Sequence, residues 1–254
     1  MKIKIALMRW FVGSAVACFL GVTACSQQRS PAPASSKTAV STPTAPATTS
    51  LSPTGPLTHL TQRSGSKMRL EGTSTAHDWQ SESGVIMGYL DVGPNFPIEP
   101  GQTVAPGKVE AKGEAWVAVK SLKSKKKDNS YYDDKMDDKM YAMLSETNHP
   151  KIVFKLTELV LKEPAKDKTS PYIFEAKGDL AVAGKTNAIS FPAKVLPLGE
   201  KGGDRRVKVS GEVPLKMSQY GMEPATMILV VKTGDDVTVK FDWVVGEKIS
   251  APSK

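Results

Sequence analysis

The sequence predicts a mainly β domain, an antiparallel barrel or sandwich, placed behind an export signal and a long tether. Apolar and polar residues alternate with period two over much of residues 60–246. Glycine-containing turns separate the alternating runs, and a single stretch has the spacing of an amphipathic helix. Many strands with short connections and almost no helix are typical of antiparallel β architectures.

Residues 1–24 have the pattern of a secretory signal peptide. Lys2, Lys4 and Arg9 form a basic start, and an apolar run from Trp10 to Leu20 follows. This run is shorter than the roughly 20 apolar residues that a transmembrane helix needs. The pattern therefore predicts a protein that is exported from the cytoplasm.

The end of this leader, Val22-Thr-Ala-Cys25, resembles the bacterial lipobox, in which the cysteine is diacylated and becomes the new N-terminus. We therefore predict a lipoprotein of the cell envelope or periplasm, held at a membrane through acylated Cys25. The alternative is ordinary cleavage after Ala24.

Composition narrows the function classes. Cys18 and Cys25, the only cysteines, both lie in the leader segment, so the remaining chain can form no internal disulfide and no thiolate metal site. Removing the three basic residues of the leader lowers the formal net charge from +8 to +5. This modest surplus, without a basic helix or a basic stripe with interleaved aromatics, gives no support to nucleic-acid binding.

Residues 25–59 form the predicted tether. They are rich in Pro, Ala, Ser and Thr, and Arg29 and Lys37 are the only charged residues in the stretch from Ser26 to Pro56. Such a segment buries too little apolar area to offset its ordering entropy. We predict an extended stalk between the anchor and the domain at 60–246, with residues 247–254 as a C-terminal tail.

The predicted strands follow from the alternation. In the last of them Val237, Val239, Phe241 and Trp243 alternate with polar residues. Turns are predicted at Gly184-Lys185, Gly202-Gly203 and Gly234-Asp235. The predicted strands are Lys67–Thr73, Val85–Asp91, Val109–Lys120, Ile152–Thr157, Tyr172–Ala183, Ala188–Val195, Val207–Lys216, Met227–Lys232 and Val237–Trp243.

One helix is predicted from Tyr131 to Thr147. Met136, Met140, Met143 and Leu144 fall at helical spacing and form an apolar stripe, which suggests a lid or plug with the three methionines as its adaptable face. The aspartates at 133, 134, 137 and 138 lack the spacing of a calcium loop, so we predict a solvated acidic face and no metal site.

An ordered series of short motifs over residues 60–246 resembles the YceI-like family. The motifs are Glu71–Trp79, Ser121–Ser124, Lys139–Leu144, His149–Phe154, Gly178–Lys185 and Gly234–Phe241. The resemblance implies an eight-stranded antiparallel, lipocalin-like barrel with a short helix near its mouth. It also implies that the barrel holds a lipid-like small molecule, an isoprenoid or other amphiphile, as characterised relatives do with a long polyisoprenoid chain.

The alternation places a set of apolar side chains in the barrel interior, where they are the candidate ligand contacts. An eight-stranded barrel is either filled by such side chains or encloses one small ligand, and alternation alone does not choose. A filled barrel would make the domain a non-catalytic structural or interaction module of the envelope. The candidates are Phe174, Leu180, Val182, Ile189, Phe191, Val207, Val209, Val239, Phe241 and Trp243.

The sequence favours a binding protein over an enzyme. His77 and Asp78 are adjacent, and adjacent residues of an extended chain point to opposite faces, so they form no dyad by themselves. No nucleophile elbow, zinc-protease motif or phosphate loop is present, and no cofactor is predicted. Two loops remain open in role. The Pro- and Gly-rich stretch from Gly93 to Gly107 could cover one barrel end, and the lysine run Lys123–Lys127 is either a solvated loop or a contact with anionic lipid.

Overall fold

The structure is a computed structural model that describes residues 55–248 except 133, 224–225 and 228–230. The predicted signal peptide, Cys25 and most of the tether lie outside these residues, as does the tail beyond Lys248. No helix in the described part of the chain has the length and apolarity needed to cross a membrane.

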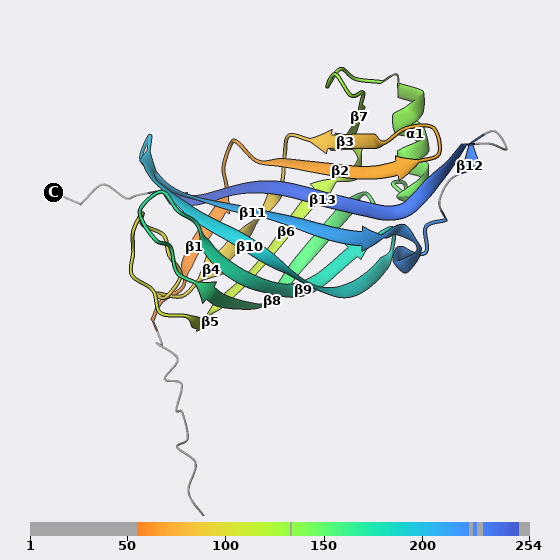
Figure 1. The fold of residues 1–254 in the computed structure, drawn as a ribbon. Coiled ribbons are helices and arrows are strands. Elements are labelled where there is room, and N and C mark those ends of the chain that lie inside the picture. Colours follow the sequence, from red (N-terminus) through yellow and green to blue (C-terminus); the bar gives the residue numbers. More distant parts are fainter. Residues whose placement is uncertain (1–54, 133, 224–225, 228–230, 249–254) are drawn as a thin grey trace, which may run out of the picture. The chain divides into compact units, whose positions relative to one another are not determined.

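Thirteen strands and one α-helix make up the described domain (Figure 1). The helix α1 spans Asp134–Met143, and two 3₁₀ turns, η1 and η2, span Val119–Ser121 and Met217–Tyr220. The strands are β1 (Thr58–Gln62), β2 (Lys67–Ser74), β3 (Trp79–Ser83), β4 (Met87–Val92), β5 (Gly107–Val109), β6 (Ala111–Ala118), β7 (Lys123–Lys125), β8 (Lys151–Glu163), β9 (Tyr172–Val182), β10 (Lys185–Lys201), β11 (Asp204–Lys216), β12 (Thr226–Met227) and β13 (Val231–Lys248).

Eight antiparallel strands close into a ring. They follow the order β1-β4-β6-β8-β9-β10-β11-β13, and β13 pairs back onto β1 at Thr61↔Gly246 and Gln62↔Val245. Three short strands continue this wall toward α1: β2 pairs with β13 and β3, and β3 pairs with β7. The predicted antiparallel eight-stranded barrel with a single helix is confirmed.

Alternation places one face of each long strand inside. Along β9, Tyr172, Phe174, Ala176, Gly178, Leu180 and Val182 are buried, while the residues between them are partly or fully exposed. The turn around Gly202-Gly203 joins β10 to β11, and both glycines have positive φ, +63° and +77°, which a residue with a Cβ rarely adopts. These features are local in sequence, and the prediction found them.

The structure corrects several element predictions. The stretch Gly234-Asp235 is not a turn but lies inside β13, where the register against β2 shifts between Thr233 and Val237. The predicted separate strand at Met227–Lys232 is divided between β12 and the start of β13. The helix is shorter than predicted, because the chain turns at Ser145, whose φ is +52°.

The barrel has two unlike ends (Figure 1). Helix α1 stands at one end, which we call the helix end. The connection between β4 and β5, residues 93–106, lies at the opposite end with β5, and we call this the loop end. The candidate site lies between these two ends.

Candidate functional site

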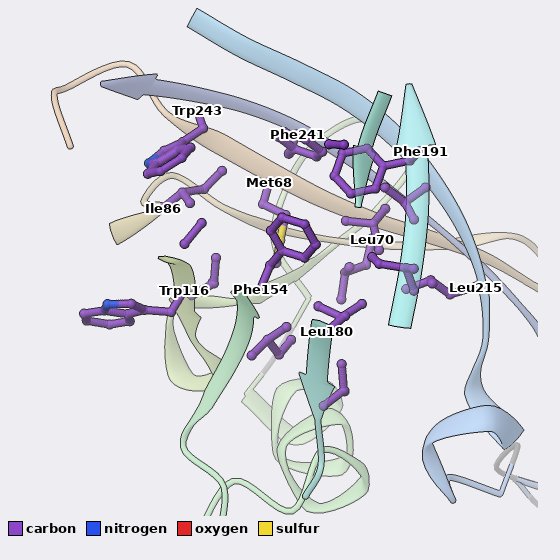
Figure 2. A pocket seen from close by; sticks show the side chains of 18 of the residues that line it. Met68, Leu70, Ile86, Trp116, Phe154, Leu180, Phe191, Leu215, Phe241 and Trp243 are labelled. Carbon is purple, nitrogen blue, oxygen red and sulfur yellow. The ribbon is translucent and has the colours of Figure 1, made fainter. Parts of the chain in front are cut away.

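The barrel interior contains a hollow of about 230 Å³. Side chains from β2, β8, β9, β10, β11 and β13 point into it, as Figure 2 shows for Met68, Phe154, Leu180 and Phe191. It extends from Met140 and Tyr220 at the helix end to Phe96 at the loop end. The interior of this barrel is therefore only partly filled by its own side chains.

The wall of the hollow presents almost no polar atoms. The inward positions Gly113 and Ala115 of β6 are small, so the main chain of this strand forms part of the wall, and the outward residues Glu114 and Trp116 also border it. Water in such a space would lack hydrogen-bond partners, and apolar cavities of this kind stay dry. The hollow is suited to hydrocarbon.

Three aromatic rings cross the middle of the hollow. The rings of Phe154 and Phe191 lie 5.4 Å apart between centroids, and the ring of Phe241 meets that of Phe191 edge-on at 5.8 Å. Glycines make room for them. A Cβ on Gly178 would come within 2.5 Å of the Phe154 ring, and a Cβ on Gly211 within 2.7 Å of the Phe241 ring. The two glycines therefore let the rings of Phe154 and Phe241 lie close to the strands of the wall.

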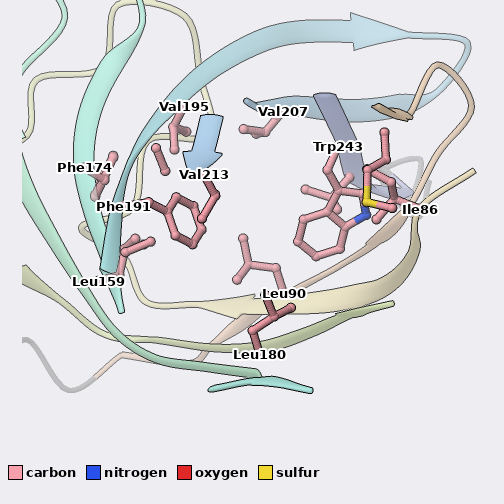
Figure 3. Close-up of a cluster of buried hydrophobic side chains, with 14 of the residues drawn as sticks. Ile86, Leu90, Leu159, Phe174, Leu180, Phe191, Val195, Val207, Val213 and Trp243 are labelled. Atoms are coloured by element: carbon pink, nitrogen blue, oxygen red, sulfur yellow. The ribbon is translucent and has the colours of Figure 1, made fainter. Parts of the chain in front are cut away.

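The loop end is closed by buried side chains, of which Figure 3 shows Phe174 and Val207 within the larger buried cluster. Phe174, Val207 and Val245 have no exposed surface there. Phe96, which comes from the loop between β4 and β5 and is 1% exposed, packs against Phe174 with ring centroids 5.9 Å apart. The Pro- and Gly-rich stretch, whose role the sequence left open, thus supplies a buried ring at this end of the barrel.

Helix α1 borders the hollow at the other end. Met140 and Met143 line it, together with Leu144 directly after the helix, whereas Met136 does not. The helix lies beside β7, which pairs with β3, and within the described residues no strand joins β7 to β8. Two of the three predicted lid methionines are therefore in position to cover the hollow.

A buried carboxylate holds α1 to the wall. Asp137 is 4% exposed, its Oδ1 accepts a hydrogen bond from the Ser124 N–H at 2.7 Å, and its Oδ2 lies 3.0 Å from Nζ of Lys123. Burial alone would raise the pKa of Asp137, but the bonds from Ser124 and Lys123 outweigh it and hold the pKa below its ordinary value. Asp137 is thus not part of the solvated acidic face that the sequence predicted.

The hydroxyl of Tyr141 adds a second tie between the helix and the wall. It donates to the carbonyl oxygens of Leu122 at 2.8 Å and of Lys120 at 3.1 Å. Both ties join α1 to residues 120–124, the segment that leads into and includes the start of β7. Residues 144–150 connect the C-terminal end of α1 to β8.

The structure places the ten predicted interior residues as follows. Eight of them line the hollow: Leu180, Val182, Ile189, Phe191, Val209, Val239, Phe241 and Trp243. Phe174 and Val207 are fully buried in the solid loop end and do not border the hollow. The alternation of apolar and polar residues therefore identified the inward-facing side chains. Only the structure shows which part of the barrel interior is filled by them and which part is hollow.

Sequence reasoning missed several residues of the wall. Phe96 lies in a loop, where no alternation marks a residue as inward, although a lone Phe among Pro and Gly is itself a signal of burial. Met217, Tyr220 and Met222 come from η2 and the residues after it. Trp79 covers Gly72 of the neighbouring strand, where a Cβ would lie 2.3 Å from the indole ring.

The described residues contain no group of three or more His, Cys, Asp or Glu side chains that could hold a metal ion. The Nδ1 atom of His77 bonds the Asp78 carbonyl oxygen at 2.8 Å, so the imidazole faces its own backbone. His59 Nδ1 lies 2.5 Å from Asp91 Oδ1 on the exposed side of β1. In the lysine run, Lys125 pairs with Glu82 at 3.4 Å.

A family model for the YceI-like domain matches residues 72–245. The chain belongs to the YceI-like family. This match covers the ring strands from β4 to the closing strand β13 and leaves out β1. No curated protein matches the chain in sequence.

Solved structures with a similar fold have low sequence identity to this YceI-like protein. BcnA of Burkholderia cenocepacia is 16% identical, with a TM-score of 0.49 over 70% of this chain and 95% of its own. A polyisoprenoid binding domain from Saccharophagus degradans, implicated in plant cell wall breakdown, is 11% identical, with a TM-score of 0.48 over 75% and 98%. The YCEI protein of Campylobacter jejuni is 15% identical, with a TM-score of 0.45 over 66% and 84%.

Proposed function

We propose that this protein binds an amphiphile, with an isoprenoid-like or other hydrocarbon tail held in the hollow of the barrel. The observation that carries the proposal is the apolar space of about 230 Å³ inside a closed ring of strands. The motifs of this protein resemble the YceI-like family, and characterised relatives in that family hold a long polyisoprenoid chain. A polyisoprenoid is apolar along its length, as is the wall of this space.

Energetics favour an occupied hollow. At about 24 cal/mol per Å³, an empty cavity of about 230 Å³ forgoes about 5.5 kcal/mol of stability. That is a large part of the roughly 5–15 kcal/mol by which a domain is stable. Burying about ten methylene-equivalent carbons returns roughly 8 kcal/mol before the costs of association. Micromolar affinity needs about that much.

The alternative, a structural module with a side-chain-filled barrel, fits only the loop end. The proposal includes no catalytic step and no cofactor, because a wall with almost no polar atoms offers no acid, base or nucleophile to a bound tail. In this proposal α1 is the lid through which the tail enters and leaves.

The proposed location is the cell envelope, with the domain anchored through acylated Cys25 and standing off the membrane on the tether at residues 25–59. Two or three acyl chains hold a protein firmly, whereas one gives only marginal binding. Cys25→Ala is the test: intact-mass measurement should show the loss of acyl mass, and the variant should leave the membrane fraction. An unacylated, soluble wild-type protein from the native host would exclude the anchor.

The binding proposal is tested on the full chain purified from its own host. Native mass spectrometry followed by lipid extraction should reveal a bound amphiphile, and the emptied protein should take up polyprenyl compounds or fatty acids on titration. Val209→Glu, which puts a carboxylate in the hollow wall, should abolish uptake, whereas Lys208→Glu on the same strand should not. Absence of bound lipid, together with no uptake, would exclude the proposal.

A further inference from the structure

The hollow is open at one end and blind at the other. The hollow is not fully enclosed, and the exposed residue Lys216 borders it at the helix end. At the loop end it stops at Phe96, which is 1% exposed and is backed by the fully buried Phe174. A tail that enters from the helix end therefore meets the ring of Phe96 as its floor.

The loop that carries Phe96 is fixed by its own hydrogen bonds. The side-chain oxygen of Gln102 accepts from the Ile98 N–H at 3.0 Å, and the Phe96 N–H donates to the Gly93 carbonyl oxygen at 3.0 Å. The hydroxyl of Tyr172 on β9 donates to the Gln102 carbonyl oxygen and so ties the loop to the barrel. These hydrogen bonds therefore hold the Phe96 side chain in a fixed position at the end of the hollow.

The polarity of the wall sets the direction of the ligand. A charged or hydrogen-bonding headgroup would lose its water inside the hollow, where the accessible wall is almost entirely apolar. The headgroup therefore stays outside at the helix end, and the tail enters first. In this orientation, the length of tail that is buried equals the distance from the helix end of the hollow to Phe96.

The size of the buried tail can be described in two ways, by the length of the hollow along the barrel axis and by the number of carbons that its volume holds. The lining on β10 runs from Ile189 to Val195, about 20 Å at roughly 3.3 Å per residue. A strand tilt of about 35–45° reduces this to about 15 Å along the barrel axis. By proportion to an apolar cavity of about 150 Å³ that takes benzene, the hollow holds on the order of ten carbons.

From these observations we propose that Phe96 sets the tail length that the protein selects. The ligand class is a single-chain amphiphile, and the tail contributes to affinity only as far as the Phe96 floor. Affinity should rise about fourfold for each methylene that is buried. It should stop rising at about ten carbons, because further carbons remain outside the blind hollow. This inference rests on the proposed function.

The test is a chain-length series on the emptied full chain. Saturated fatty acids from six to eighteen carbons, and isoprenoid alcohols of two to four isoprene units, would displace a fluorescent fatty acid. Wild type should show the rise and then the plateau. Phe96→Ala should move the plateau to longer tails, and Ala193→Leu, which adds volume to the lining near the floor, should move it to shorter ones.

Val104→Ala is the matched control, because Val104 is buried in the same loop but does not border the hollow. It should leave the plateau in place. Phe96→Leu replaces Phe96→Ala if the latter fails to melt cooperatively, and Ala193→Leu tests the floor independently of the loop. A plateau that moves in neither direction, or affinity that climbs through eighteen carbons in wild type, overturns the inference while the binding function stands. If no member of the series binds, the proposed function itself fails.

Discussion

Val207 and Val209 lie two residues apart on the inner face of β11, and their surroundings differ completely. Val207 has no exposed surface and packs in the solid loop end, whereas Val209 borders the hollow and stays partly accessible. Both are the same residue type on the same strand. The difference shows that alternation assigns a side chain to the interior, while the side chains opposite decide whether that interior is filled.

Phe96 and Phe174 fill the loop end, whereas further along the barrel small inward residues leave room. Gly113, Gly178 and Gly211 all occupy inward positions of the wall. A close-packed interior tolerates neither lost nor added volume, whereas a hollow tolerates both better. The following predictions test this contrast between the two ends, from the largest expected effect to the smallest.

Truncating a ring should cost most at the solid end. Phe174→Ala should lower the free energy of unfolding by about 3–5 kcal/mol, because the lost contacts and the new cavity add. Phe241→Ala should cost clearly less, since part of the Phe241 ring already faces the hollow. Urea unfolding of both variants is the measurement. Equal costs would show that the two ends are packed alike.

Adding an aromatic ring should also affect stability differently at the filled loop end and in the hollow. Val207→Phe should destabilise the protein by about 1–3 kcal/mol through overpacking. Val209→Phe should leave the stability of the emptied protein nearly unchanged or raise it, and should weaken lipid uptake, because the new ring occupies the hollow. Thermal melts and lipid titration of the pair decide this. A Val209→Phe variant as damaged as Val207→Phe would argue against the hollow.

Removing the Asp137 carboxylate should loosen the lid without unfolding the ring. Asp137→Ala loses the bonds to Ser124 and Lys123, and we expect the local stability of α1 to fall by about 1.5 kcal/mol. Hydrogen exchange should become faster in α1 and remain unchanged in β9 and β10. The control is Asp138→Ala, an exposed aspartate of the same helix. Faster exchange throughout the barrel would contradict a local role.

Lowering the pH should weaken the same contact between Asp137 and residues Lys123 and Ser124. Because the pKa of Asp137 is lower in the folded protein than the ordinary value, its contribution is complete above about pH 4 to 5 and is lost as the pH falls through the folded pKa. Exchange of α1 relative to β10, corrected for intrinsic rates, should be the same at pH 7 and pH 5 and rise toward pH 3. Asp137→Asn should lack this helix-specific step. A step near pH 6 would point to a histidine instead.

Much of the fold could be predicted from the sequence. The long strands β8 to β11 and β13 are marked by their own alternation. The strands β3 and β7 were missed because their inward residues are serines: Ser81, Ser83 and Ser124 are buried but polar. Ser83 is satisfied by the Val85 carbonyl oxygen and the Ser121 hydroxyl, a partnership that only the folded chain reveals.

The candidate site was less predictable than the fold. The inner face could be assigned from β9, β10, β11 and β13, but the hollow depends on side chains that meet across the barrel. Phe96 and Asp137 show the limit, since each acts through a contact with a distant segment: Phe96 with Phe174, and Asp137 with Ser124. Periodicity along the chain carries no information about such pairings.

The pairing of β1 with β13 has a consequence for how the molecule is made. Thr61 and Gly246 stand at nearly opposite ends of the domain, yet their strands form the seam that closes the ring. Contacts between residues so distant in sequence slow folding, because the loop between them must be ordered first. The ring therefore cannot form during synthesis until its last strand is complete, and removing residues 244–248 should leave a sheet with two free edges that aggregates.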